Sequence, residues 1–324
     1  MNYFSMFSGI GGFEIGISNA MEQRGRGQEE SNVAADSTHP VSQSNKRQYA
    51  TCVGYSEIDK YAIKVYERNF KHENYGDATK INERELPDFD LLVGGFPCQA
   101  FSIAGKRQGF NETRGTLFFD IARILKYKRP RHLVLENVKG LLSHDSGKTF
   151  QTILKVLTDL GYSVEWQVLN AKDFGVPQNR ERIFIVGHLG GECGRKVFPF
   201  RQSSSENVEQ KPIAHTINSS DWRGANRNQK QTTIRTDNPS TPERGDKPNS
   251  TNGIRRASYT DGARIRRLTP LECERLMAYP DNWTKYGVGD ELISDTQRYK
   301  MCGNGIVSNV VSEVVGGLID VGCL

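Results

Sequence analysis

The sequence lacks any apolar run of the roughly 18 to 20 residues that a helix needs to cross a bilayer. Hydrophobic residues make up 36% of its 324 residues, and the mean hydropathy is −0.59. The opening stretch, MNYFSMFSGIGGFEIG, also lacks the basic leader and the small-residue cleavage site of a signal peptide. We therefore expect no membrane partner and no export. A chain of this length is sufficient for one large domain and a smaller one.

Metal-binding patterns are equally absent. The six cysteines are scattered, with no C-x-x-C pair and no Cys/His cluster at metal-ligand spacing; they are Cys52, Cys98, Cys193, Cys273, Cys302 and Cys323. This distribution predicts reduced thiols in a reducing compartment and no metal centre.

The chain as a whole lacks a large excess of either charge, with 43 Lys or Arg against 38 Asp or Glu. The formal net charge of +5 favours an anionic partner only weakly. The distribution is more informative, because residues 201–267 contain 13 Lys or Arg against 7 Asp or Glu. This basic segment is the part of the chain best suited to contact phosphates.

Short apolar runs alternate with helical patterns over the first 190 residues. Apolar residues recur at helical spacing within GTLFFDIARILKYKRP and SGKTFQTILKVLTDLGY, which predicts two helices. The predicted strands are NYFSMF, TCVGYSEI, DLLVGG, HLVLEN, VEWQVLNA and RIFIVGH. Most of them are apolar enough to be buried on both faces, so we predict a doubly wound α/β sheet.

Two polar stretches interrupt this pattern. Residues 24–50 are poor in large apolar side chains, which predicts a flexible surface insertion. Residues 201–262 are rich in Ser, Asn, Thr, Gln and Arg, and they form either a disordered linker or a small domain built of loops. Helical patterns return at TPLECERLMAY and NGIVSNVVSEVVGGLI, so we expect the fold to resume there.

The segment FSMFSGIGGFEIG reads as a strand, a glycine turn and the start of a helix, which allows backbone N–H groups to approach a ligand. The dinucleotide pattern G-x-G-x-x-G fails, because Glu14 occupies the third glycine position, and a plain strand-to-helix turn remains an alternative. Glu57 ends the second strand 48 residues after Gly9; without the 27 residues of the insertion the spacing is 21. That spacing is typical of an acid that binds ribose hydroxyls, and it favours a nucleoside-type cofactor.

Cys98 and Glu136 each follow a predicted buried strand, where open α/β sheets bind their ligands. Taken alone, Cys98 is a candidate for a small buried hydrophobe, and Glu136 for a capping or salt-bridging acid. Arg180 and Arg182 are two positions apart and share one face of an extended segment, although a solvated pair is the alternative. Together, a thiol, a carboxyl group and guanidiniums suit nucleophilic attack on an electron-poor ring.

These stretches, taken in order, resemble the C5-cytosine DNA methyltransferase family of bacteria and phages. FSGIGGFEIG, SEIDKYA and GDATKI resemble its cofactor motifs, GGFPCQAFSIAGKRQGF its catalytic loop and RGTLFFDIARIL the helix that follows. LENVKGL resembles its catalytic glutamate motif and PQNRERIFIVG its arginine motif. RIRRLTPLECERLMAYPDNW and YKMCGNGIVSNVV resemble its two C-terminal motifs. One departure is Ser5, which stands where many members carry an aspartate.

The resemblance implies a Rossmann-like methyltransferase sheet with a smaller, loop-rich target-recognition domain. It implies a catalytic and cofactor-binding domain at residues 1–190 and 300–324, and a target-recognition domain and hinge at residues 191–299. The basic surplus and the Asn, Gln and Arg side chains of the variable region suit contacts to phosphates and base edges of double-stranded DNA. A solvated polar linker remains the alternative there.

The resemblance also implies the chemistry. Cys98 would add to a cytosine flipped out of the duplex, and the methyl group of S-adenosylmethionine would move to ring carbon 5. Glu136 would protonate ring nitrogen 3, or form hydrogen bonds with that nitrogen and with the exocyclic amine. Arg182 would hold the carbonyl oxygen of the cytosine, and Arg180 would support the site. The cofactor-contacting positions implied by the motifs are Phe7, Gly9, Gly11, Glu57, Asp59, Asp77 and Asn304.

Three other functions compete with this interpretation. An RNA-methylating relative would share the catalytic motifs, but the Cys-Phe-Thr signature of the transfer-RNA branch is absent. A regulatory relative without activity would be expected to have lost Cys98 or Glu136. A nicotinamide-dependent oxidoreductase leaves the Pro-Cys and Glu-Asn motifs unexplained. The expected setting is a monomer in the cytoplasm of a bacterial or phage-infected cell, acting alone or beside a cognate restriction endonuclease.

Overall fold

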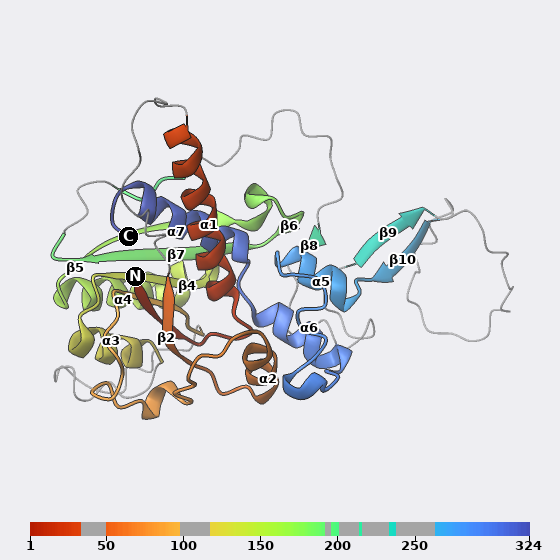
Figure 1. The fold of residues 1–324 in the computed structure, drawn as a ribbon, viewed down its shortest axis with the longest axis horizontal. Coiled ribbons are helices and arrows are strands. Elements are labelled where there is room, and N and C mark those ends of the chain that lie inside the picture. Colours follow the sequence, from red (N-terminus) through yellow and green to blue (C-terminus); the bar gives the residue numbers. More distant parts are fainter. Residues whose placement is uncertain (34–49, 98–116, 192–195, 201–213, 216–232, 238–262) are drawn as a thin grey trace, which may run out of the picture.

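The computed structural model describes residues 1–33, 50–97, 117–191, 196–200, 214–215, 233–237 and 263–324. At its centre lies a six-stranded sheet in the order β2-β1-β3-β4-β7-β5, with helices on both faces (Figure 1). The strands are β1 Asn2–Met6, β2 Thr51–Ser56, β3 Leu91–Gly95, β4 His132–Val138, β5 Tyr162–Asn170 and β7 Glu181–Leu189. All six strands predicted from the sequence are therefore present.

The sheet is parallel from β2 to β4, whereas β7 runs antiparallel to both β4 and β5. The link between β5 and β7 explains this reversal. It holds only a 3₁₀ turn and the short strand β6 (Gln178–Asn179), and a parallel return would need a crossover of about a dozen residues or more. The α/β prediction is confirmed, with one reversed strand that the apolar pattern did not indicate.

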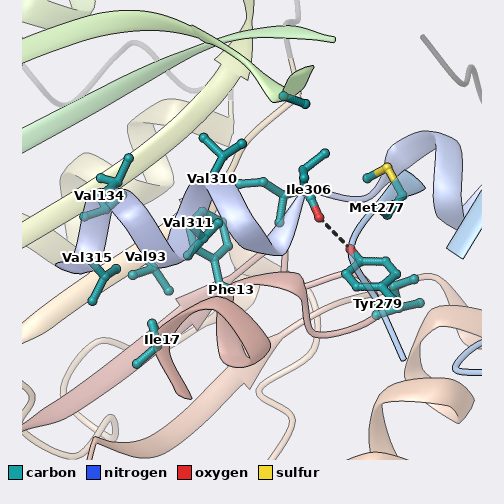
Figure 2. Packing of buried hydrophobic residues seen from close by; sticks show 14 of the residues in the cluster. Phe13, Ile17, Val93, Val134, Met277, Tyr279, Ile306, Val310, Val311 and Val315 are labelled. Carbon is teal, nitrogen blue, oxygen red and sulfur yellow. Dashed lines mark hydrogen bonds between the residues drawn. The ribbon is translucent and has the colours of Figure 1, made fainter. Parts of the chain in front are cut away.

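Alternating strand residues feed two hydrophobic cores, as the period of two along a strand requires. Val93 and Val134 face helices α1 (Gly12–Val33) and α7 (Ser308–Asp320), and Figure 2 shows them beside Phe13 and Val311. Leu92 and Leu133 face the opposite way, toward α3 (Leu117–Lys128) and α4 (Lys148–Asp159). The carboxyl ends of the central strands are thereby fixed from both sides.

Helices α1 and α7 lie side by side across one face of the sheet (Figure 1). Gly16 permits this approach, because a Cβ there would lie 2.5 Å from Val311. Arg24 bonds Asp320 at 3.1 Å where the helices end their contact. α1 continues to Val33, so the first part of the 24–50 stretch is helical, which its polar composition did not predict; residues 34–49 lie outside the described residues.

The C-terminal part begins with a two-stranded sheet, β9 (Thr233–Asp237) with β10 (Ala263–Arg267), which lies away from the main sheet beside α5 (Pro270–Leu276) (Figure 1). α5 starts where the sequence indicates, since Thr269 and Glu272 form a capping box with Pro270 at the first helical position. Most of the variable region lies outside the described residues.

One described stretch, Asp295–Asp320, is long and apolar enough by composition to cross a membrane. It comprises α6 (Asp295–Asn304) and α7, and most of it is buried inside the protein, as a core helix would be.

The cysteines follow the prediction only in part. Cys52, Cys273 and Cys302 are reduced and buried, but Cys323 is disulfide-bonded. The prediction of six reduced thiols is therefore wrong for Cys323. Spacing along the chain did not reveal the bond, because cysteines distant in sequence can meet in the fold.

Candidate active site

The glycine turn directly follows β1 and leads into α1. Phe7, Gly9 and Gly11 have φ values of 55°, 55° and 89°, in the left-handed region that favours glycine. A Cβ on Gly11 would lie 2.3 Å from the ring of Phe70, whereas a Cβ on Gly9 would meet nothing within 4 Å among the described residues. The turn therefore needs glycine at position 11 for packing and presents an open face at Gly9.

Glu57 closes one side of this turn. Its Oε2 accepts a hydrogen bond from the N–H of Gly9 at 2.8 Å, and its Oε1 accepts from the N–H groups of Ile58 and Asp59, both at 2.8 Å. The fold thus brings together two residues that lie 48 positions apart in the sequence. The carboxylate is fixed beside the turn; its Oε1 already accepts two hydrogen bonds, whereas Oε2 accepts one and retains acceptor capacity.

Asp59 and Asp77 already accept hydrogen bonds from other parts of the protein. Asp59 caps helix α2 (Lys60–Asn69) and bonds Lys300 of α6 at 2.6 Å. Burial tends to raise the pKa of Asp59, but Lys300 and the capping N–H groups bring it below its usual value. Hydrogen bonds from Thr79 likewise lower the pKa of Asp77.

Two residues that the sequence did not indicate connect these parts. The side-chain oxygen of Asn74 accepts from the N–H groups of Glu57 (3.3 Å) and Gly76 (2.9 Å), so it ties the Asp77 loop to the end of β2. Lys300 ties α6 to the start of α2. Asn74 lies outside the quoted motifs, and Lys300, although it lies in YKMCGNGIVSNVV, carries no sequence signal for its contact with Asp59, so only the fold reveals both links.

Glu136 lies inside β4, opposite Gly95 of β3 and Phe184 of β7, rather than in a loop after the strand as predicted. Its Oε1 pairs with Nε of Arg182 at 2.9 Å, and the two side chains are 12% and 17% exposed. A Cβ on Gly95 would lie 3.1 Å from Oε2 of Glu136, so glycine leaves that oxygen its space. Burial raises the pKa of Glu136, although Arg182 and Arg180 oppose the shift.

Arg180 is buried, so the alternative of a solvated pair does not hold. Its guanidinium donates to the carbonyl oxygens of Gly303 (3.1 Å) and Gly305 (2.6 Å). These two residues flank Asn304, which is exposed at the end of α6. Ile306, which follows Gly305, is held as well, because the hydroxyl of Tyr279 donates to its carbonyl at 2.8 Å (Figure 2). Arg180 therefore connects the start of β7, which carries Arg182, to the end of α6, which carries Asn304.

Cys98 lies outside the described residues, which end this segment at Pro97. The chain that leads to it is anchored next to Glu136, because Nδ2 of Asn137 donates to the carbonyl of Phe96 at 2.8 Å. The Glu-Asn pair of LENVKGL thus has two distinct tasks: the glutamate pairs with Arg182, and the asparagine holds the segment before Cys98.

A second buried acid, Glu14, lies beneath the glycine turn in the first turn of α1. The Tyr66 hydroxyl donates to its Oε1 at 3.0 Å and is also 2.9 Å from Nδ1 of His72. Burial raises the pKa of Glu14 to about 7, although hydrogen bonds from Ser5 and Tyr66 oppose the shift. The failed third glycine position was the only sequence signal for this residue.

The described part of the chain contains no group of three or more His, Cys, Asp or Glu side chains that could hold a metal ion. The site instead combines a glycine turn with an adjoining carboxylate and, near the ends of β3 and β4, a largely buried acid paired with a guanidinium. These features define an α/β protein with an open glycine turn and, near the carboxyl ends of its central strands, a pair of charged side chains.

Comparison with known proteins specifies the class. Residues 1–236 and 196–320 match the family described as C-5 cytosine-specific DNA methylase. The chain belongs to this family, and it is a DNA cytosine methyltransferase. The resemblance inferred from the motifs is confirmed.

Individual relatives agree with this assignment. Type II methyltransferase M1.ScrFI of Lactococcus lactis subsp. cremoris is 40% identical over 82% of this chain and 71% of its own length. Type II methyltransferase M.HhaI of Haemophilus parahaemolyticus is 35% identical over 97% of this chain and 93% of its own. The solved structure of the Entamoeba histolytica methyltransferase EhMeth superposes with a TM-score of 0.65 at 16% identity, covering 99% of this chain and 98% of that one, and shows the shared fold.

Proposed function

We propose that the enzyme transfers the methyl group of S-adenosylmethionine to carbon 5 of a cytosine flipped out of duplex DNA, through a covalent adduct with Cys98. The observation that carries the proposal is the largely buried Glu136–Arg182 pair at 2.9 Å, next to the anchored chain that leads to Cys98. Flipping is required because the ring atoms cannot be reached inside the base stack.

The residues divide the reaction between them. The Cys98 thiolate would add to ring carbon 6, and the electron pair gained at carbon 5 would form the new bond to the methyl carbon as the sulfur–methyl bond of S-adenosylmethionine breaks and S-adenosylhomocysteine leaves. Loss of the carbon-5 proton to a base then restores the ring as the carbon–sulfur bond breaks and the thiolate leaves. S-adenosylmethionine supplies an electrophilic methyl group when it is bound.

Glu136 stabilises the ring during the attack. Its raised pKa keeps a larger fraction of the carboxyl group protonated, and a protonated carboxyl group can donate to ring nitrogen 3. Arg182, whose guanidinium already pairs with Glu136, would donate to the carbonyl oxygen of the cytosine. Arg180 would act indirectly, by holding the carbonyls that flank Asn304.

The glycine turn fits a nucleoside-type methyl donor. A Cβ at Gly9 would meet nothing within 4 Å among the described residues, and the adjoining Glu57 carboxylate can accept from ribose hydroxyls. The other residues proposed to line this site are Phe7, Gly11, Asp59, Asp77 and Asn304. The hydrogen bonds of Asp59 and Asp77 favour a supporting role for both, since each already caps a helix or turn.

We further propose that residues 1–190 and 300–324 form the catalytic and cofactor-binding domain, and that residues 191–299 form the target-recognition domain and hinge. The basic surplus in residues 201–267 supports DNA contacts by that region. The proposed setting is a monomer in the cytoplasm of a bacterial or phage-infected cell. The relatives named Type II methyltransferase suggest a cognate restriction endonuclease that acts on the same sequence.

Transfer of tritiated methyl from S-adenosylmethionine to duplex DNA tests the proposal. The wild type and Cys273→Ala, a change at a buried cysteine of α5, should incorporate 5-methylcytosine, and Cys98→Ala should not. Equal activity in Cys98→Ala would exclude the adduct. Incorporation into RNA but not into DNA would instead favour the RNA-methylating alternative.

A further inference from the structure

Two side chains from distant parts of the chain hold the glycine turn. Glu57 accepts the N–H of Gly9, and the indole N–H of Trp283 donates to the carbonyl of Ile10 at 2.8 Å. Three residues of the turn have positive φ values, and such backbone persists only where its surroundings hold it. The bond from Trp283 engages a carbonyl in the middle of that turn.

Trp283 is itself held rigidly by a buried carboxylate. Glu274 of α5 accepts the N–H groups of Asn282 at 2.8 Å and Thr284 at 2.9 Å, the residues on either side of Trp283. The same carboxylate bonds Arg298 of α6 at 3.0 Å, and Glu274 is fully buried. The backbone of Trp283 is therefore fixed at both ends before its ring reaches the turn.

The ring of Trp283 also packs beside the turn. It meets Phe70 edge to face, with centroids 5.7 Å apart. Phe70 in turn lies against Gly11, where a Cβ would come within 2.3 Å of its ring. One aromatic pair thus contacts the turn at two neighbouring residues, with Phe70 at Gly11 and Trp283 at Ile10.

We propose that Trp283 is a positioning residue for the methyl donor: its indole N–H, by holding the Ile10 carbonyl, keeps the glycine turn in the shape that binds S-adenosylmethionine. This inference rests on the proposed function, in which the turn is the donor site. Trp283 makes no contact to reacting atoms in this account, so it acts on donor affinity and not on the chemical step.

The variant Trp283→Phe removes the N–H donor and retains an aromatic ring against Phe70. We expect the Kd and KM for S-adenosylmethionine to rise about three- to tenfold, as for loss of one hydrogen bond, with kcat and the KM for DNA unchanged. Trp166→Phe is the matched control, because Trp166 lies on β5, is 44% exposed and contacts Phe150 instead. A fall in kcat with an unchanged KM for S-adenosylmethionine would overturn the proposal, because it would indicate a purely structural role.

Calorimetry with S-adenosylhomocysteine separates this inference from the function beneath it. Failure of the wild type to bind would overturn both, whereas equal binding by the wild type and Trp283→Phe would overturn the role of Trp283 alone. If Trp283→Phe does not fold, NMR of the indole N–H groups of the wild type provides the test instead. The variants Trp166→Phe and Trp222→Phe identify the other two indole signals, so the remaining signal is that of Trp283. The Trp283 signal should shift when S-adenosylmethionine binds, and an unmoved signal would contradict the proposal.

Discussion

Two carboxyl groups, the buried Glu14 and the largely buried Glu136, differ in what surrounds them. Glu136 pairs with the guanidinium of Arg182 at 2.9 Å, with Arg180 close behind. Glu14 has a hydroxyl from Tyr66 at 3.0 Å and no cationic side chain bonded to it within the described ranges. Burial raises the pKa of both, but only at Glu136 do opposing positive charges limit the rise.

The comparison teaches that burial alone does not make an acid catalytic. Glu136 lies near the carboxyl end of β4, where Arg182 and Arg180 oppose the rise in its pKa; in the proposed reaction Arg182 also binds a substrate oxygen. Glu14 lies beneath the glycine turn, where the Tyr66 hydroxyl connects it to His72. We infer that Glu14 influences the stability of the fold around the glycine turn, whereas Glu136 takes part in the reaction.

The largest expected effect comes from Glu136→Gln, which removes the proposed proton donor and the charged partner of Arg182. We expect kcat to fall about 10²- to 10⁴-fold, the range typical of a lost general acid. The matched control is Glu14→Gln, which makes the same change at the other buried glutamate and should leave kcat near wild type. The measurement is the rate of methyl transfer by both variants, with their melting temperatures recorded. An equal loss of activity in Glu14→Gln and Glu136→Gln would contradict the distinction between the two acids.

The next effect concerns stability and pH. The pKa of Glu14 is about 7 in the fold and near 4.5 when unperturbed, so the folded state binds the extra proton between these values. The free energy of unfolding should therefore decrease from pH 4.5 to 7 and stay low above it, with an upper bound of roughly 3 kcal/mol.

Glu14→Gln cannot ionise, so it should gain stability relative to wild type at pH 8 and lose this part of the pH dependence. Urea unfolding of both proteins from pH 5 to pH 8 measures the difference. Parallel pH profiles for the two proteins would show that Glu14 does not titrate as its burial indicates.

A smaller effect is expected for Arg182→Lys, which keeps the positive charge but loses the planar guanidinium. We expect kcat/KM for DNA to fall about tenfold, because Lys replaces one well-oriented donor near the substrate. Steady-state kinetics with varied DNA measures this. An unchanged kcat/KM would mean that charge alone is needed beside Glu136.

The smallest effect is expected for Tyr66→Phe, which removes the hydroxyl that donates to Glu14. Loss of one buried hydrogen bond should lower the free energy of unfolding by about 1 kcal/mol. It should also raise the pKa of Glu14 further, because that bond favours the charged form. The midpoint of the pH-dependent unfolding profile would then move upward, and a downward movement would contradict this account.

Much of the fold was predictable, because buried strands and amphipathic helices carry strong periodic signals. The reversal of β7 was not, since an apolar strand reads alike in either direction. Arg180 and Arg182, which the sequence placed on one face, have different partners. Arg182 pairs with Glu136 of the neighbouring strand β4, whereas the bonds of Arg180 to the Gly303 and Gly305 carbonyls depend on how α6 packs, which the sequence does not show. The roles inferred for Glu274 and Trp283 likewise depend on contacts between segments far apart in the chain.

The most direct test of the central claim is trapping of Cys98 on duplex DNA that contains 5-fluorocytosine, in the presence of S-adenosylmethionine. Fluorine at carbon 5 leaves no proton to lose, so the carbon–sulfur bond cannot break after methyl transfer. Mass spectrometry of the digested complex should find methylated fluorocytosine attached to Cys98 and none with Cys98→Ala. A complex attached to a residue other than Cys98 would contradict the account. So would the absence of any trapped complex in a preparation that methylates ordinary duplex DNA.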